Sequence, residues 1–159
     1  MIRKHVIAYT DGSALGNPGP GGYGTLLLHG TSKKELSGGF RRTTNNRMEI
    51  TAAIEALKAL KEPCRVTLYT DSKYLANAIS KGWAEQWQRN HWMRNKSEPA
   101  LNPDLWATLL DLCKIHEVEF VWTKGHAGDT YNERCDRLAR EAAARPNLPP
   151  DVGYDHSSS

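Results

Sequence analysis

Residues 65–72 have the sequence RVTLYTDS, in which a run of β-branched and aromatic side chains is followed directly by an aspartate. Such a run is typical of a strand that ends at the acid. Residues 6–13 (VIAYTDGS) repeat the ending, so Tyr-Thr-Asp occurs twice and leads to Asp11 and to Asp71. If the two strands are neighbours in a sheet, both acids emerge at one edge, where open α/β sheets hold their ligands.

Each acid also has a purely structural explanation. Asp11-Gly12 is a common turn pair, and Asp71 can cap the helix that follows it. Neither explanation accounts for two identical endings. We therefore treat the two carboxylates as a candidate site.

The other elements are predicted outward from these strands. Strands are expected over residues 5–10, 23–28, 34–40, 65–70 and 117–122, and helices over 45–61, 72–80, 105–113 and 131–144. Trp83 and Trp87 have helical spacing. The order β-β-β-α-β-α-α-α-β-α favours an α/β fold with a mixed sheet and helices on its faces.

The end of the chain is rich in proline. Pro146, Pro149 and Pro150 are expected to end regular structure. We expect one domain over residues 1–154 and a disordered tail over residues 155–159.

The composition limits the class of protein. The chain has 159 residues, of which 39% are hydrophobic, and this length buries a core without disulfides, so collagen-like, disordered and coiled-coil classes are excluded. Three widely spaced cysteines form no C-x-x-C pair, which suits a reducing compartment, and we expect a cytoplasmic protein. The opening residues contain no signal-peptide core or membrane span, so no membrane partner is expected.

The positive charge is concentrated in one segment. The chain carries a formal charge of +3, and residues 81–96 hold four bases, one acid and three tryptophans. Basic groups interleaved with aromatic rings suit nucleic-acid binding. The alternative for tryptophan is core packing, which we expect for Trp87, Trp106 and Trp122.

Two further acids lie on helix faces where apolar residues belong. Glu49 falls on the stripe of Ala53, Ala56 and Leu60, although a glutamate in a first helical turn is also favoured by the helix dipole. Asp136 follows Cys135 at the flank of the packed face of the last helix. Its alternative is a surface ion pair with the base at i+4, Arg140.

Bringing these acids together requires a counter-charge. Two unit charges about 4 Å apart repel by about 4 kcal/mol at an effective dielectric constant of about 20. Hard oxygen ligands specify Mg²⁺ or Mn²⁺. A zinc site built from the three cysteines and a histidine has no ligand spacing in its favour.

Several long motifs occur together in one order: residues 10–13 (TDGS), 16–22 (GNPGPGG), 43–49 (TTNNRME), 69–72 (YTDS), 122–128 (WTKGHAG) and 132–136 (NERCD). With these motifs the chain closely resembles bacterial ribonuclease H of type I, over residues 2–154. The resemblance implies an RNase H-like fold with a five-stranded sheet. It also implies an endonuclease that cuts the RNA strand of RNA/DNA hybrids without base-sequence specificity, leaving 3′-hydroxyl and 5′-phosphate ends.

The resemblance also assigns roles in catalysis. Asp11, Glu49, Asp71 and Asp136 fall on the metal-binding carboxylates of the family, the same four acids that the pattern singles out. Two Mg²⁺ ions, with Mn²⁺ as a substitute, would activate the attacking water and stabilise the leaving 3′-oxygen. His126 falls on a loop histidine that assists proton transfer or product release; its alternative is an exposed loop residue.

Substrate contacts follow from the same resemblance. Asn17, Asn45 and Asn46 would contact the hybrid backbone and its 2′-hydroxyls, and Thr44 and Asn102 would hold a phosphate of the DNA strand. Trp83 would pack on a DNA sugar, within a basic protrusion over residues 83–96.

The chain departs from the family in two places. Gln88, Asn90 and His91 replace a denser run of bases, so a shallower salt dependence is expected. Lys73 stands where another member has glutamine. The glycine-rich residues 16–22 enter a strand, so we interpret them as a hairpin turn and not a phosphate loop.

Two other functions remain open. A transposase or integrase core shares the fold and the clustered acids, but the chain lacks a further DNA-binding domain. A non-enzymatic module could bind hybrid or double-stranded RNA through residues 81–96, with the acids merely structural. For the enzyme we expect a monomer that acts on RNA/DNA hybrid.

Overall fold

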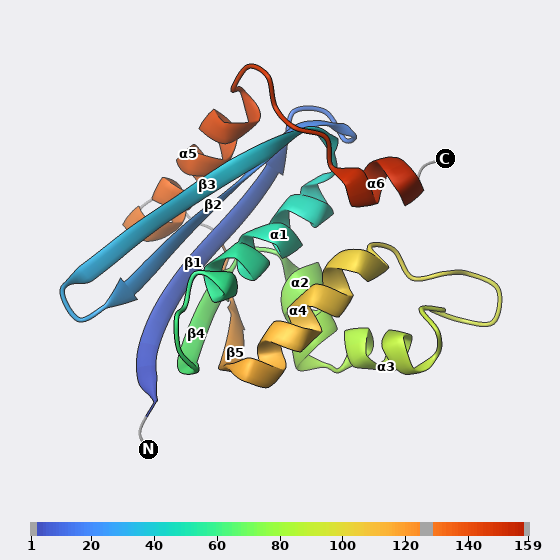
Figure 1. Cartoon of the computed structure of the whole chain (residues 1–159), viewed down its shortest axis with the longest axis horizontal. Helices are drawn as coiled ribbons and strands as arrows, with labels where there is room; N and C mark the ends of the chain where they lie inside the picture. Colours follow the sequence, from blue (N-terminus) through green and yellow to red (C-terminus); the bar gives the residue numbers. More distant parts are fainter. Residues whose placement is uncertain (1–2, 125–128, 158–159) are drawn as a thin grey trace.

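The computed structural model describes residues 3–124 and 129–157, and its centre is one five-stranded sheet. The strands are β1 (Lys4–Ala14), β2 (Gly19–His29), β3 (Ser32–Thr43), β4 (Cys64–Thr70) and β5 (Glu117–Trp122). They lie in the order β3-β2-β1-β4-β5, so β3 and β5 form the edges (Figure 1).

The sheet is mixed, as predicted. β1, β2 and β3 form an antiparallel meander, whereas β4 runs parallel to β1 and β5 runs parallel to β4. In the register of β1 and β4, Tyr9 is opposite Tyr69. The two Tyr-Thr-Asp endings therefore lie side by side, as expected from their repetition.

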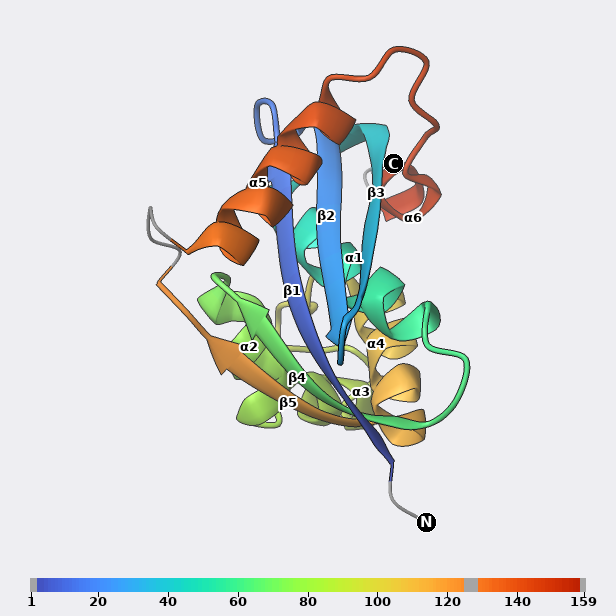
Figure 2. The same ribbon diagram turned by 90° about the vertical axis from the view of Figure 1, so that its left-hand side faces the viewer.

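Helices cover both faces of the sheet. They are α1 (Asn45–Lys58), α2 (Lys73–Ser80), α3 (Trp83–Arg89), α4 (Pro103–Ile115), α5 (Thr130–Ala143) and α6 (Val152–Ser157). Helix α5 crosses β1, β2 and β3 on one face, whereas α1 packs against the other face with α4 behind it (Figure 2). The predicted α/β fold with helices on both faces is confirmed.

Helices α1, α2 and α5 begin where short polar side chains cap them. Thr44 Oγ1 accepts from the Arg47 N–H at 3.2 Å, Ser72 Oγ from the Leu75 N–H at 3.1 Å, and an Asp129 carboxylate oxygen from the Asn132 N–H at 3.2 Å. The cap of α2 is thus Ser72 and not Asp71. The structural explanation of Asp71 as a helix cap does not apply, and its carboxylate is left for another role.

Helix α5 lies unusually close to the sheet because glycines face it. A Cβ on Gly22 or Gly24 would run into the backbone of α5 at Ala139 or Cys135. The Cys135 thiol also donates to the Tyr9 carbonyl at 3.3 Å. These contacts fix the height of α5 over the end of β1.

Three predictions about the elements are corrected by the structure. β1 does not stop before Asp11 but continues to Ala14, because the glycine-rich start of β2 pairs with it there. Regular structure does not end at the prolines, since α6 follows them. Trp122 is not in the core: it is 40% exposed at the end of the edge strand β5, whereas Trp106 is fully buried.

The hairpin interpretation of residues 16–22 is confirmed. The Leu15 N–H donates to the Pro20 carbonyl at 2.7 Å, and β2 then returns antiparallel to β1. Within residues 3–124 and 129–157, no helix has both the length and the apolar character needed to cross a membrane.

Candidate active site

Asp11 and Asp71 lie together at one edge of the sheet. Asp11 is on β1, two residues beyond the last parallel pair with β4, and Asp71 directly follows β4. Parallel strands bring their carboxyl ends to the same edge, which is why the repeated ending produces a pair of carboxylates. Asp11 is buried, and Asp71 is more exposed.

Glu49 reaches this edge from helix α1. It lies in the second turn of α1 and is 8% exposed, so the helix-dipole explanation for a first-turn acid does not apply. Helix α1 can approach β1 because residue 12 is glycine. A Cβ on Gly12 would overlap the backbone of Met48 and Glu49. This close approach places the Glu49 carboxylate beside Asp11.

The three carboxylates form one cluster. One oxygen from each of Asp11, Glu49 and Asp71 lies within 4.8 Å of the others. Burial, together with the neighbouring Asp71, raises the pKa of Asp11 to about 7. Burial and the charges of Asp11 and Asp71 also raise the pKa of Glu49 well above its usual value. The cluster therefore strongly disfavours three simultaneous negative charges unless a cation joins it.

One atom of this cluster is unsatisfied. Among the residues that the structure describes, Glu49 Oε1 is the buried side-chain polar atom that has no hydrogen-bond partner. Buried carboxylate oxygens are normally paired, since leaving one bare is costly. An all-oxygen set with a bare buried oxygen fits a hard divalent cation such as Mg²⁺.

Asp136 lines the same cavity but stands apart from the cluster. The cavity is lined by Asp11, Gly12, Ser13, Asn45, Asn46, Glu49, Asp71, Ser72, Lys73, Tyr74 and Asp136. Asp136 is not in the group within 4.8 Å, and it pairs with Arg140 at 2.9 Å, the ion pair considered as its alternative. Its charge nevertheless contributes to the raised pKa of Asp11. The structure thus brings three of the four predicted acids together and places the fourth at the rim.

Two of the predicted asparagines, Asn17 and Asn45, are oriented by backbone N–H groups. Asn45 Oδ1 accepts from the Ala14 N–H at 2.6 Å, and Asn17 Oδ1 accepts from the Asn45 N–H at 3.1 Å. With their oxygens occupied, both amides present their NH₂ groups as donors. Asn46 lies between two cavities, lining the acid cavity and the neighbouring one that contains Trp83.

The tryptophan-rich segment lies beside that second cavity. Trp83 begins α3 and is 37% exposed, with the Lys81 ammonium 5.5 Å from its ring centre. Trp87 instead packs against Trp106, as predicted for a core residue. Arg94 pairs with Glu98 at 2.7 Å. This pair further reduces the positive charge of residues 83–96, which already have fewer bases than the family's protrusion.

Trp122 and Lys73 are a pair that the sequence did not reveal. The Trp122 indole N–H donates to the Asp71 carbonyl at 3.0 Å, and the Lys73 ammonium lies 4.7 Å from the Trp122 ring centre. Both contacts arise because β5 lies next to β4, so the end of one strand meets the residues that follow the other. The pair holds Lys73 at the edge of the acid cavity by a cation–π contact.

The remaining predicted site residues are Thr44, Asn102 and His126. Thr44 and Asn102 precede α1 and α4, and both contact Arg47: Thr44 through the Arg47 backbone and Asn102 through its side chain. His126 lies outside the described residues, so its predicted role stays a prediction.

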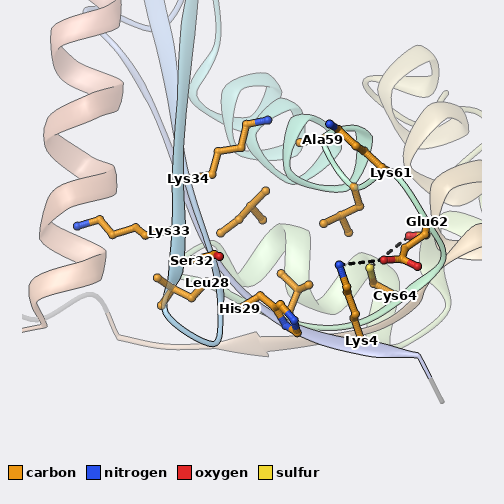
Figure 3. A pocket seen from close by; sticks show the side chains of 13 residues that line it. Lys4, Leu28, His29, Ser32, Lys33, Lys34, Ala59, Lys61, Glu62 and Cys64 are labelled. Atoms are coloured by element: carbon orange, nitrogen blue, oxygen red, sulfur yellow. Dashed lines mark hydrogen bonds and ion pairs between the residues drawn. The ribbon is translucent and has the colours of Figure 1, made fainter.

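A separate cavity lies at the other end of β1 (Figure 3). Lys33, Lys34 and Lys61 line it, together with Lys4, which pairs with Glu62 at 3.0 Å. Among the described residues that line it, there are none of the predicted site residues and no cluster of carboxylates. The acid cavity is therefore the candidate active site.

Comparisons with known proteins agree with the fold. The family model for RNase H matches residues 3–144. A ribonuclease H from Syntrophus aciditrophicus is 63% identical over 152 residues, covering 96% of this chain and 88% of the relative. This similarity confirms the resemblance to the bacterial enzymes.

Solved structures show the same architecture. LC9-RNase H1, a type 1 RNase H with the type 2 active-site motif, superposes with a TM-score of 0.81 at 31% identity, covering 100% of this chain and 82% of that chain. LC11-RNase H1 in complex with RNA/DNA hybrid gives a TM-score of 0.64 at 25% identity, covering 97% and 99% of the two chains. The chain, with its paired strand-end aspartates and the glutamate that α1 adds to them, belongs to the ribonuclease H family of endonucleases.

Proposed function

We propose that this protein hydrolyses the RNA strand of RNA/DNA hybrids at the cavity that contains Asp11, Glu49 and Asp71, and that it leaves 3′-hydroxyl and 5′-phosphate ends. The carboxylate cluster is the observation that carries the proposal, because it combines a raised pKa at Asp11 with a bare buried oxygen on Glu49. A site of this kind is built to receive cations.

In this proposal Asp11, Glu49 and Asp71, with Asp136 at the rim, hold two Mg²⁺ ions. When bound, the ions would lower the pKa of the attacking water and stabilise the leaving 3′-oxygen. The chain itself contributes the positioning: Gly12 lets Glu49 reach Asp11, and the Trp122 N–H fixes the Asp71 carbonyl.

Recognition of RNA is assigned to the asparagines beside the acids. Asn17 and Asn45 have their oxygens engaged within the chain, so they donate to 2′-hydroxyl and phosphate oxygens of the substrate. Trp83 supplies an exposed ring against which a sugar of the DNA strand packs. These contacts are to the sugars and phosphates, which carry no base sequence, so we propose cleavage without sequence specificity.

The free thiols bear on where in the cell the protein acts. Cys64, Cys113 and Cys135 are all free, which suits the reducing cytoplasm that we propose as its location. We also propose that the enzyme acts as a monomer, which light scattering at working concentration would test.

The decisive experiment compares labelled RNA/DNA hybrid, RNA duplex and DNA duplex, each with Mg²⁺ or with EDTA. We expect cleavage of the RNA in the hybrid alone, and only with Mg²⁺. Cleavage that persists in EDTA would refute the metal site. Hybrid binding without any cleavage would instead favour the non-enzymatic binding module.

A further inference from the structure

Lys73 is a cation placed beside carboxylates that need a counter-charge. It is the first residue of α2, and it lines the acid cavity together with Asp11, Glu49 and Asp71. Its ammonium carries three N–H donors on a flexible four-carbon stem, so it is a natural partner for such acids. Glu49 Oε1 in particular is buried with no hydrogen-bond partner among the described residues. A lysine in this position is expected to pair with the cluster.

The Lys73 ammonium does not pair with these acids. It lies 4.7 Å from the centre of the Trp122 ring, and among the described residues it makes no ion pair or hydrogen bond with a carboxylate. The face of an indole attracts a cation, and tryptophan does so more strongly than tyrosine or phenylalanine. The cation–π contact therefore takes the place of an ion pair.

The Trp122 ring is itself fixed in place. Its indole N–H donates to the Asp71 carbonyl at 3.0 Å. Helix α2, which begins with Lys73, packs against β5, which ends with Trp122 (Figure 2). The ring is thus tied to the residue that supplies one carboxylate of the cluster, while its face holds the cation that would compete for that carboxylate.

A lysine bound to the cluster would weaken the binding of a divalent cation. Both cations use the same carboxylate oxygens, and the apparent affinity for Mg²⁺ falls with the fraction of molecules in which those oxygens are accessible. Glutamine, which another member of the family has at position 73, carries no charge and needs no such restraint. A lysine at this position does need one.

We propose that Trp122 is a positioning residue that holds the Lys73 ammonium away from the carboxylate cluster and so keeps the cluster open to Mg²⁺. The inference rests on the proposed function, since it takes the cluster to be the metal site. It goes beyond that function because it concerns how the protein keeps its own lysine out of the site, and not how RNA is bound or cut.

Coupling between positions 73 and 122 tests the proposal. The variants are Trp122→Leu, Lys73→Gln and the double variant, and Mg²⁺ binding is measured by calorimetry at low ionic strength without hybrid. Leucine removes the ring face and frees Lys73 to pair with the cluster. We expect Trp122→Leu to raise the Kd for Mg²⁺ about twofold to fivefold, the range that corresponds to a cation–π contact at an exposed site. Adding Lys73→Gln should restore the wild-type Kd.

A purely structural role for Trp122 gives a different result. If the leucine merely loosened the end of β5, Mg²⁺ binding would weaken equally with lysine or glutamine at position 73, and such additivity would overturn the proposal. Tyr154→Leu is the matched control. It removes the ring that lies 5.2 Å from the Arg42 guanidinium, outside the acid cavity, and should leave the Kd for Mg²⁺ unchanged.

Trp122→Phe separates the ring from its N–H group. Phenylalanine keeps an aromatic face but cannot donate to the Asp71 carbonyl. We expect a Kd for Mg²⁺ between those of the wild type and Trp122→Leu, and Lys73→Gln should again restore it. A loss of affinity that Lys73→Gln leaves in place would assign the effect to the N–H bond and overturn the proposal.

The wild-type protein offers a measurement that needs no variant to fold. Methylene protons of Lys73 that lie over the indole face have NMR resonances displaced by the ring current. We expect this displacement in EDTA and, unchanged, with Mg²⁺. Its absence in EDTA would show that the ammonium leaves Trp122 when no cation is supplied, which contradicts the proposal.

Failure of the inference and failure of the proposed function give different results. A wild type that binds Mg²⁺ and cleaves the hybrid, but shows no coupling between positions 73 and 122, refutes the inference alone. A wild type that neither binds Mg²⁺ nor cleaves the hybrid refutes the proposed function, and the inference with it.

Discussion

Asp11 and Glu49 are held where their charges are unfavourable in the absence of a cation. These charges lower the stability of the metal-free protein. Glu49 Oε1 is buried without a partner, and the pKa of Asp11 is raised. The same property that makes the site receptive to Mg²⁺ should therefore destabilise the empty fold.

Asp11→Asn separates these two effects. Removing one negative charge should abolish cleavage of the hybrid while raising the stability of the metal-free protein by about 1–3 kcal/mol. Cleavage assays with Mg²⁺ and urea melts in EDTA measure the two quantities. A loss of stability would instead indicate that the carboxylate is part of a structural network.

The stability of the metal-free protein should depend on pH in an unusual direction. An unfolded aspartate titrates near 3.8, whereas the pKa of Asp11 in the fold is about 7, so the folded state binds more protons between these values. As regards this group, the free energy of unfolding should be greatest below about pH 3.8, the pKa in the unfolded chain. It should fall by on the order of a few kcal/mol as pH rises to about 7.5.

Urea melts in EDTA at several pH values test this dependence. The Asp11→Asn variant should show a much flatter profile over the same range. Binding of Mg²⁺, measured by calorimetry, should weaken below pH 7, since protons compete for the carboxylates. A free energy of unfolding that rises steadily from pH 5 to 8 would contradict the raised pKa of Asp11.

At the level of single residues the sequence predicted some placements and missed others. Asp11 and Asp71 were predictable because a repeated strand ending becomes one sheet edge when the strands are parallel neighbours. Trp122 was wrongly assigned to the core, since the strand's own sequence does not show that β5 is an edge strand with an exposed end residue. The network of Arg47 left no signal, because its partners are 55–104 residues away in the chain.

At the scale of elements, the decisive contact is between α1 and β1. Gly12 has no side chain, and the backbone of Met48 and Glu49 occupies the space that a Cβ would need. The sequence showed a helix with one misplaced acid, but it did not show how near to β1 that helix lies.

Gly12→Ala should push α1 away from β1. We expect a loss of about 1–3 kcal/mol in stability from overpacking, and a lower affinity for Mg²⁺, because Glu49 moves away from Asp11. Gly30→Ala is the matched control: Gly30 has a φ of +59° and open space around it, so the substitution strains the turn without touching the site. Calorimetric titration should show reduced Mg²⁺ affinity for the first variant only.

The ends of the elements were the least predictable part. β1 extends past Asp11 because β2 pairs with it there, and a pairing partner is not visible in the strand's own sequence. Helix α6 follows three prolines, and tertiary contacts account for it: Asp151 accepts from Thr43 Oγ1 at 2.7 Å and anchors the segment that enters the helix.

At the scale of the whole molecule, the C-terminal segment is joined to β3 and to the start of α1. Asp151 binds Arg47, the Arg41 N–H donates to the Pro149 carbonyl at 2.9 Å, and Tyr154 lies beneath the Arg42 guanidinium. The overall α/β architecture could be predicted from the order of the elements, but this closing contact could not.

Deleting residues 149–159 should therefore destabilise the protein strongly. Arg47 would lose one of its two carboxylate partners and stay buried, which costs about 3–5 kcal/mol when a buried ion pair is broken. Thermal melts measure the loss, and deletion of residues 158–159 serves as the control that should not change the Tm. An unchanged Tm for the longer deletion would show that Arg47 finds another partner.

The bare glycine surface beneath α5 has a consequence for how that helix can evolve. Because Gly24 lets α5 rest against β2 close to Cys135, aspartate is long enough at position 136 to reach the rim of the cavity. A methyl group at position 24 would lift the helix, and the shorter acid would then fall short. A glutamate at position 136 would compensate, because its side chain is longer. Glycine at 24 should therefore be tolerated with aspartate at 136, and alanine at 24 with glutamate at 136, whereas the other two combinations should not.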